Sequence, residues 1–398
     1  MPKPRACENW LRTFLDWTLP VSEAPESLLI WTGLFCISAV LKRDVRFSKE
    51  WTKQYDIFPT NYLMFVGPPG VVRKSTSAGY GQKVIEEMNR GLSVTSPAYV
   101  NLGPTSGSHV AIMDKMSETV DGSMTIIAGE FGNIVSTMPG ETFTYFQKMF
   151  DADGTADRYE HSTRGVGNTV IKYPSLNIFG CTIPDWITEN AGYMVRGGFA
   201  ARTVFVFENK KRQSRLFYKD VGPSVKELDG MRKKLAIDLA RIGKLKGEAR
   251  PETDKLTKRM EDWYQEYERA PVERGVETFK ARKHIHTLRT AMLISLCERD
   301  DLIITSKHFN RALELIEDVE GKLSRGLSSV GRNPASNMLY EVLDYILANA
   351  PIKRNKVSAY FFKDVPTEQM SQIFEVLKAS EEIEELTVDG TLRRKRKK

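Results

Sequence analysis

Residues 62–76 read YLMFVGPPGVVRKST, and this stretch carries the strongest structural signal in the chain. The continuous apolar run 62–66 predicts a short buried strand. A glycine-proline loop follows it, and residues 75–89 then have the pattern of a helix. Strand, loop and helix in this order are the context that a phosphate-binding loop requires, because backbone N–H groups at the start of the helix point toward the anion.

The loop departs from the usual pattern G-x-x-x-x-G-K-[ST] in two ways. Arg73 stands where a glycine normally precedes the lysine, and the loop is one residue longer. Since Arg73 has a Cβ where glycine would permit an unusual φ, we expect the loop to follow a different path. Lys74 and Ser75 remain suited to phosphates and Mg²⁺, whereas the plain alternative is an ordinary tight turn. The predicted ATP-binding residues are Gly67, Pro68, Pro69, Gly70, Val71, Val72, Arg73, Lys74, Ser75 and Thr76.

Further apolar runs predict that strands and helices alternate after this loop. Strands are expected at 98–102, 124–128, 176–181 and 203–207, with a helix from about 109 to 119. Buried strands that alternate with helices predict an α/β fold with a mostly parallel sheet. Before the run 176–181, residues 157–174 predict a two-stranded hairpin around the glycine-containing turn 164–167.

An acidic residue ends one of the predicted strands. Glu130 follows the run 124–128, where a carboxylate beside a phosphate loop can orient the attacking water or hold Mg²⁺ together with Ser75. Two acids usually stand at this place, but Gly129 fills the first position. The alternatives are a solvated glutamate with no catalytic role, or a catalytic acid elsewhere, such as Asp151 or Asp153.

Four further polar residues are candidates for contacting the γ-phosphate. Asn177 or Thr182, in the run LNIFGCT, could sense it from the next strand. Arg196 and Arg202 precede the last strand, and an arginine there could reach a γ-phosphate in its own subunit or in a neighbour. Polar strand ends and surface arginines are also common without any such role.

The chain divides by pattern into four segments. We expect an N-terminal helical segment at 1–50, a P-loop ATPase core at 51–207, a helical lid region at 208–330 and a winged-helix domain at 331–398. The apolar run 28–41 is too short to span a bilayer, so it predicts a buried helix. Residues 283–323 predict two amphipathic helices around a short connector.

Composition and charge narrow the class of protein. The 398 residues carry a net charge of +7, which favours a polyanionic partner such as DNA. The four cysteines form no C-x-x-C pair and predict free thiols, and the N-terminus has no signal peptide, so a cytoplasmic location is expected. The candidate DNA-binding residues lie in the hairpin and the basic tail: Arg158, Arg164, Lys172, Arg393, Arg394, Lys395 and Arg396.

The ordered motifs GPPGVVRKST, IIAGEFG, LNIFGCTIPDWI and GGFAARTVFVF resemble those of helicase-like P-loop ATPases encoded by phages, prophages and plasmids. These proteins are related to superfamily 3 and AAA+ replicative helicases, and the resemblance runs from about residue 10 to 323. It implies that ATP and Mg²⁺ bind at the loop lysine and hydroxyls and that the 158–172 hairpin contacts DNA. The implied catalytic set is Glu130 as the acid, Asn177 as the sensor, and Arg202 or Arg196 acting in trans.

The resemblance implies a function on DNA. We expect an ATP-driven motor that forms a homo-oligomeric ring, such as a hexamer, and serves replication of a phage or mobile element. One alternative is an ATP-dependent DNA-binding or initiator protein without unwinding activity. The other is an ATPase of a defence or packaging system. The departures at Arg73 and Gly129 bear on hydrolysis more than on ATP binding.

Overall fold

The structure is a computed structural model, and it divides into two compact units, Met1–Gly326 and Leu327–Lys398, which are described separately. The expected segments 1–50 and 51–207 both lie in the first unit, together with most of 208–330. The residues described are 4–53, 55–135, 138–150, 158–163, 167–196, 198–219, 221–271, 276–327, 334–362, 365–380, 382–386 and 390–394.

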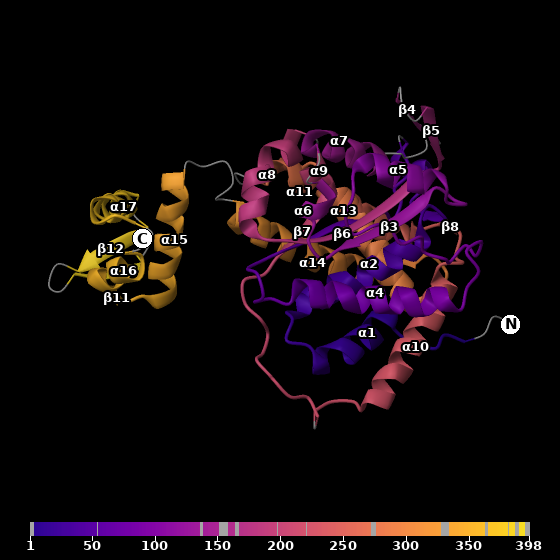
Figure 1. Ribbon diagram of the computed structural model, residues 1–398, viewed down its shortest axis with the longest axis horizontal. Helices are drawn as coiled ribbons and strands as arrows, with labels where there is room; N and C mark the ends of the chain where they lie inside the picture. Colours follow the sequence, from indigo (N-terminus) through magenta and orange to yellow (C-terminus); the bar gives the residue numbers. More distant parts are fainter. Residues whose placement is uncertain are drawn as a thin grey trace. The chain divides into compact units, whose positions relative to one another are not determined.

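A four-stranded sheet forms the centre of the first unit (Figure 1), and every pairing in it is parallel. Its order is β3 (Ser123–Ala128), β6 (Ser175–Thr182), β2 (Tyr62–Val66) and β7 (Thr203–Phe207). All residues of β2, β3 and β6 are buried, as expected for a parallel sheet that is covered on both faces. The predicted α/β fold with a parallel sheet is confirmed.

The strand predicted at 98–102 does not form. Only an isolated bridge joins Leu102 to Thr125 of β3. The reason is that the side chain of Asn89 donates to Val100 O at 2.9 Å and accepts from Val100 N at 3.1 Å. A helix side chain thus takes the backbone groups that a longer ladder would need.

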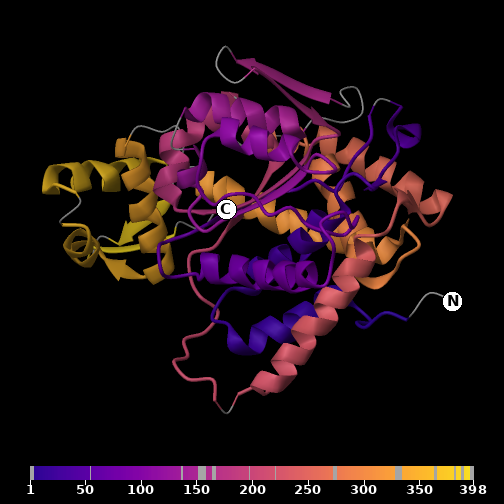
Figure 2. The ribbon, with the colours of Figure 1, turned by 45° about the vertical axis from the view of Figure 1, so that its right-hand side comes forward.

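Helices cover both faces of the sheet, as Figures 1 and 2 show. One face carries α1 (Trp10–Thr18), α2 (Glu26–Leu41), α4 (Lys74–Arg90) and α10 (Val225–Ile242). The other carries α5 (His109–Ser117), α6 (Gly132–Val135), α7 (Pro139–Phe150), α8 (Pro184–Arg196) and α9 (Phe199–Arg202). Helix α2 is buried continuously from Leu28 to Leu41, which confirms the predicted buried helix.

The remaining helices of this unit are α11 (Asp254–Arg269), α12 (Glu277–Lys280), α13 (Lys283–Glu298) and α14 (Ser306–Leu327). Helix α13 was expected to be amphipathic, but it is buried on nearly all sides because it packs against α1 and α2. Among the described residues, no helix is long and apolar enough to cross a membrane.

Short elements complete the first unit. The predicted hairpin is present as β4 (Arg158–Thr163) and β5 (Gly167–Lys172), paired antiparallel. Two parallel pairs join distant segments: β1 (Val45–Arg46) with β8 (Gly247–Glu248), and β9 (Arg250–Pro251) with β10 (Ile303–Ile304). The other two elements are η1 (Leu19–Val21) and α3 (Lys49–Thr52).

The second unit has its own core, in which Val342, Ile346, Val357 and Leu377 are fully buried. Three helices and a three-stranded antiparallel sheet of order β11-β13-β12 surround it. The elements are α15 (Pro334–Asn349), β11 (Ile352–Lys353), α16 (Arg354–Tyr360), α17 (Thr367–Ala379), β12 (Ile383–Leu386) and β13 (Thr391–Arg394). Strand β11 pairs with β13 and adds a third strand to the hairpin of β12 and β13.

The burial of α13 leads to a prediction about pH. Burial, followed by the charge of Arg289, lowers the pKa of His286 from 6.5 to about 3, while its Nε2 donates to Ala201 O at 2.9 Å. Below pH 6.5 the unfolded chain therefore takes up a proton that the folded chain does not. The free energy of unfolding should fall as the pH drops from 6.5 toward 3, by at most about 1.4 kcal/mol per pH unit from this residue.

The measurement is urea unfolding of the wild type and His286→Gln over this pH range. The variant should lose less stability per pH unit than the wild type between pH 6.5 and 3, with equal slopes above pH 6.5. Identical slopes below pH 6.5 would mean that His286 is protonated in the folded protein.

Candidate functional site

The carboxyl ends of three neighbouring strands meet at one cavity. Because β2, β6 and β3 run parallel, the segments that leave Val66, Thr182 and Ala128 emerge at the same edge of the sheet. The cavity there has a volume of about 490 Å³, within the range of small-molecule sites. It is lined by Pro69, Gly70, Lys74, Ser75, Gly129, Glu130, Phe131, Gly132, Asn133, Cys181, Thr182, Ile183, Asp185, Trp186 and Glu189.

The N-terminus of α4 opens into this cavity. The first backbone hydrogen bond of the helix runs from Ser77 N to Arg73 O. The N–H groups of residues 74–76 therefore lie at the helix end, where an anion can accept hydrogen bonds from them. Lys74 is the first residue of α4, and its side chain is largely buried. Its Nζ donates to Gly67 O and, at 3.1 Å, to Pro68 O, and burial lowers its pKa.

The base of the loop has no room for a side chain. A Cβ at Gly67 would lie 2.3 Å from the carbonyl oxygen of Glu208, the residue that follows β7. Glu208 N also donates to Val66 O at 3.0 Å, and its Oε1 accepts from Ser27 Oγ at 2.5 Å and Lys322 Nζ at 2.6 Å. Glu208 thus holds the start of the loop through backbone and side chain together.

Arg73 adopts the conformation that glycine usually provides. Its φ is +58°, in the left-handed region. The guanidinium pairs with Glu23, with Nη2 2.6 Å from Oε2, and Glu23 also accepts from Arg215 N at 2.9 Å and Lys211 Nζ at 3.2 Å. The backbone N–H of Arg215, followed by Arg73 and Lys211, lowers the pKa of Glu23 to about 2. The ion pair offsets part of the backbone strain that the arginine introduces.

Ser75 lies beside the end of β3. Its Oγ donates to Gly129 O at 3.2 Å. A Cβ at Gly129 would sit 3.6 Å from Ser75 Oγ, an ordinary contact, so the space that a second acid would fill is open. Glu130 is exposed and lines the cavity. A hydroxyl and a carboxylate therefore face one volume, and Mg²⁺ could be held there by Ser75 with Glu130 acting through water.

Two further carboxylates line the cavity and were not predicted. Asp185 and Glu189 lie one turn apart on α8, and Trp186 between them packs against Phe131 with ring centroids 5.6 Å apart. The signal was present in the sequence, because Pro184 begins a helix directly after β6 and the two acids have i, i+4 spacing. Within the described part of the chain, no three acidic, histidine or cysteine side chains are grouped closely enough to hold a metal ion.

The sensor role expected at Asn177 is wrong in its placement. Asn177 is near the amino end of β6, away from the cavity, and pairs with Thr125. Its Oδ1 accepts from Asn61 N and from Ser38 Oγ, both at 2.8 Å, so it holds α2 and the start of β2 together. Thr182, the alternative, is the last residue of β6 and does line the cavity.

The arginine expected to emerge from the sheet edge does not. Arg202 is only 6% exposed, and its Nη1 donates to Gly198 O at 2.7 Å. It precedes Thr203, which pairs with Tyr62 at the amino end of β2, so it lies at the opposite end of the sheet from the cavity, about 15 Å away along the strand. Arg196 is the last residue of α8, and its side chain lies outside the described residues.

The candidate DNA-binding residues are only partly described. Arg158 pairs with Glu160 at 2.9 Å, and Lys172 is exposed opposite Arg158 in the hairpin. In the second unit, Arg393 Nε lies 2.6 Å from Glu384 Oε1. Arg394, in β13, pairs through its backbone with Ile383 of β12, and its side chain is not described. The candidates outside the described residues are Arg164, Lys395 and Arg396, as are the alternative acids Asp151 and Asp153.

The position of Asn177 predicts a structural phenotype. Asn177→Ala should lower the free energy of unfolding by about 1–3 kcal/mol, because it leaves the buried Asn61 N–H without its acceptor, whereas the Ser38 hydroxyl keeps Pro59 O at 2.6 Å. Asn168→Ala, in the exposed hairpin, is the matched control and should change stability by less than about 0.5 kcal/mol. Denaturant unfolding measures both. Wild-type stability of Asn177→Ala would show that its carbonyl is not the acceptor described.

The left-handed backbone at Arg73 can be tested with two variants. Arg73→Gly and Arg73→Ala both remove the ion pair with Glu23, but only glycine relieves the strain. The glycine variant should therefore be more stable than the alanine variant by about 1 kcal/mol in urea unfolding. An alanine variant at least as stable as the glycine variant would place residue 73 outside the left-handed region.

The sequence was compared with protein-family models and with curated proteins. No protein-family model matches the chain, and no curated protein matches its sequence. The function is therefore argued from the residues that line the cavity.

Proposed function

We propose that this chain is a P-loop ATPase and that the cavity at the start of α4 is its active site. One observation carries the proposal: Lys74 and Ser75, at the first two positions of α4, line the same cavity as Glu130 at the end of β3. A lysine, a hydroxyl and a carboxylate around a helix N-terminus are the groups that bind and hydrolyse a nucleoside triphosphate.

Each group has a role that its position supports. The N–H groups at the start of α4 bind phosphate oxygens. When the phosphate binds, Lys74 Nζ leaves the carbonyl oxygens of Gly67 and Pro68 and donates to phosphate oxygens instead. Ser75 holds Mg²⁺, which neutralises charge on the β- and γ-phosphates when it is bound. Glu130 orients the attacking water and accepts its proton.

Asp185 supplies a second carboxylate in this proposal. The usual position for it is taken by Gly129, and Asp185 reaches the same cavity from the first turn of α8. Thr182 is the last residue of β6 and lines the cavity with the loop and Glu130. In this proposal it contacts the γ-phosphate. This assignment replaces the sensor expected at Asn177.

We also propose that the ATPase acts on DNA in the cytoplasm, as a motor serving a phage or mobile element. The order helix, short strand, helix, helix, hairpin in the second unit supports a winged helix in this proposal. The net charge of +7 and the exposed Lys172 on the hairpin also favour a polyanionic partner. A homo-oligomeric ring remains part of the proposal, with Arg196 as the next candidate to act in trans.

A second function is favoured by the loop itself. Arg73 ties the loop to Glu23, and Gly129 removes one acid beside Ser75. Both features favour tight binding with slow hydrolysis. Such a protein would be an ATP-dependent DNA-binding or initiator protein, in which ATP occupancy rather than turnover controls assembly.

The decisive experiment compares Lys74→Ala, Glu130→Gln and Asp185→Asn in ATP binding and in multi-turnover ATPase assays with and without single-stranded DNA. Lys74→Ala should abolish ATP binding, with Lys83→Ala on the same helix as the control. Glu130→Gln should keep binding and lose turnover by about 10² or more, as expected for a general base.

The outcomes separate the candidates. Turnover that DNA stimulates supports the motor, whereas ATP binding with turnover that DNA leaves unchanged supports the initiator. Loss of turnover in Asp185→Asn but not in Glu130→Gln would move the base to α8. Wild-type ATP affinity in Lys74→Ala would overturn the site.

A further inference from the structure

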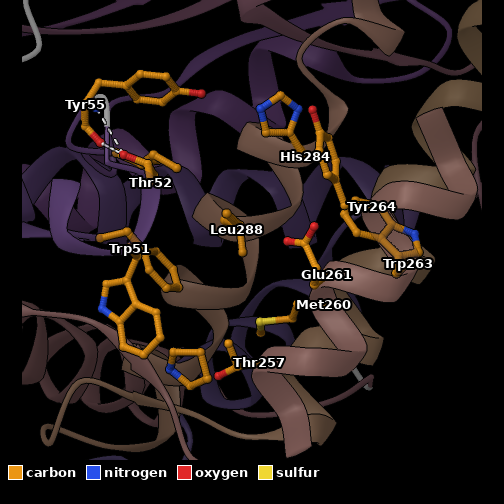
Figure 3. A pocket seen from close by; sticks show the side chains of 13 residues that line it. Trp51, Thr52, Tyr55, Thr257, Met260, Glu261, Trp263, Tyr264, His284 and Leu288 are labelled. Carbon is orange, nitrogen blue, oxygen red and sulfur yellow. Dashed lines mark hydrogen bonds between the residues drawn. The ribbon is translucent and has the colours of Figure 1, made fainter. Parts of the chain in front are cut away.

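A second cavity lies in the first unit and shares no residue with the loop cavity. Its volume is about 380 Å³, and its walls come from the segment 47–57, from α11 and from α13 (Figure 3). The residues that line it are Phe47, Trp51, Thr52, Tyr55, Ile57, Pro251, Thr257, Met260, Glu261, Trp263, Tyr264, His284 and Leu288. Nothing in the proposed ATPase uses them.

The walls of this cavity are rich in aromatic rings. Trp51, on α3, is 46% exposed although it is a large apolar side chain. Across the cavity, Tyr264 lies with its ring centroid 4.9 Å from that of His284. Trp263 stacks on Tyr267 with centroids 5.7 Å apart and is therefore held by the protein. Trp51 and Tyr264 lie on opposite sides of the cavity, and the face of an aromatic ring attracts a cation.

A carboxylate faces the same space without a cationic partner. In Figure 3 the Glu261 carboxylate points from α11 into the cavity, on the side of Leu288. Glu261 Oε1 accepts from Gln265 Nε2 at 3.0 Å, and no lysine or arginine of the described residues pairs with Glu261. Burial, followed by the charges of Glu268, Tyr55 and Glu261, raises the pKa of Tyr264. Glu261 and Glu268 are thus carboxylates whose charges act on the cavity wall at Tyr264.

His284 also lines the cavity. Its Nδ1 is buried and has no hydrogen-bond partner among the described residues. Burial, which outweighs the opposing charge of Glu268, lowers the pKa of His284, so the ring is neutral at neutral pH. Because Nδ1 has almost no accessible surface, His284 contributes the wall of its ring to the cavity rather than a hydrogen-bonding atom.

Two arginines line a neighbouring cavity. A cavity that shares Tyr55, Ile57 and His284 with this one is lined by Arg282 and Arg289. The guanidinium of Arg289 contacts residues outside the aromatic cavity. It lies 4.2 Å from the ring centroid of Phe150, and its Nε donates to Phe58 O at 2.7 Å. Arg282 acts on His284 from that neighbouring cavity, and neither arginine lines the aromatic cavity.

We propose that this second cavity binds an organic ammonium ion. The ammonium group pairs with the Glu261 carboxylate and packs against the aromatic rings that line the cavity. A phosphate or carboxylate ligand would meet the charge of Glu261, and an uncharged ligand would desolvate that carboxylate without pairing it. The ammonium group can belong to a free aliphatic diamine or to a lysine side chain of a partner protein.

The test is isothermal titration calorimetry of the full chain with putrescine and with Nα-acetyl-lysine amide. At least one should bind saturably at one site per chain, and 1,4-butanediol, an uncharged diol with the same carbon chain as putrescine, should not bind. Glu261→Gln and Trp51→Ala should each weaken binding about tenfold. Glu266→Gln, a conservative change at an exposed position of the same helix, is the matched control and should bind as the wild type does.

The result also separates this site from the ATPase. Lys74→Ala should bind the amine unchanged, so a failure of the loop cavity leaves this inference standing. Tighter binding of the diamine indicates a free amine as the source, and tighter binding of the lysine amide indicates a partner's side chain. Absence of saturable binding by both probes, or equal affinity of Glu261→Gln and wild type, would overturn the proposal.

Discussion

The parallel insertion of β6 between β2 and β3 is the constraint on which the candidate site depends. Val66 pairs with Thr182, and Ala128 pairs with Gly180, so the segments after three strands leave the sheet at one level. The loop after β2, Glu130 after β3 and Asp185 after β6 meet there for that reason. A shift of one residue in either pairing would turn inward-facing side chains to the other face of the sheet and separate these groups.

Much of the sheet could be read from the sequence, because its strands are short apolar runs bounded by glycine, proline or polar residues. The predicted strands 62–66 and 203–207 coincide with β2 and β7. The run 98–102 looks similar, but it does not form a strand, because the side chain of Asn89 pairs with the backbone of Val100. No local sequence pattern predicts that contact. Helix α13 fails as an amphipathic prediction for a related reason, since its polar side chains are buried by helices distant in sequence.

The candidate site could be predicted where sequence order alone was enough. Lys74, Ser75 and Glu130 follow strands directly, and the structure brings them to one cavity. Asn177 was assigned to the wrong end of its strand, although Thr182 stood at the right end. Asp185 and Glu189 were missed because their role depends on where α8 packs. The second cavity could not be foreseen at all, since its walls come from three segments that converge only in the fold.

Glu208 joins parts of the first unit that the sequence keeps far apart. Its backbone crowds Gly67, and its carboxylate holds Lys322 near the end of α14. Helix α14 is the last element before the chain enters the second unit. Gly67 and Lys322 are thus held by one residue. Replacing Glu208 would loosen the base of the loop and the end of α14 at the same time.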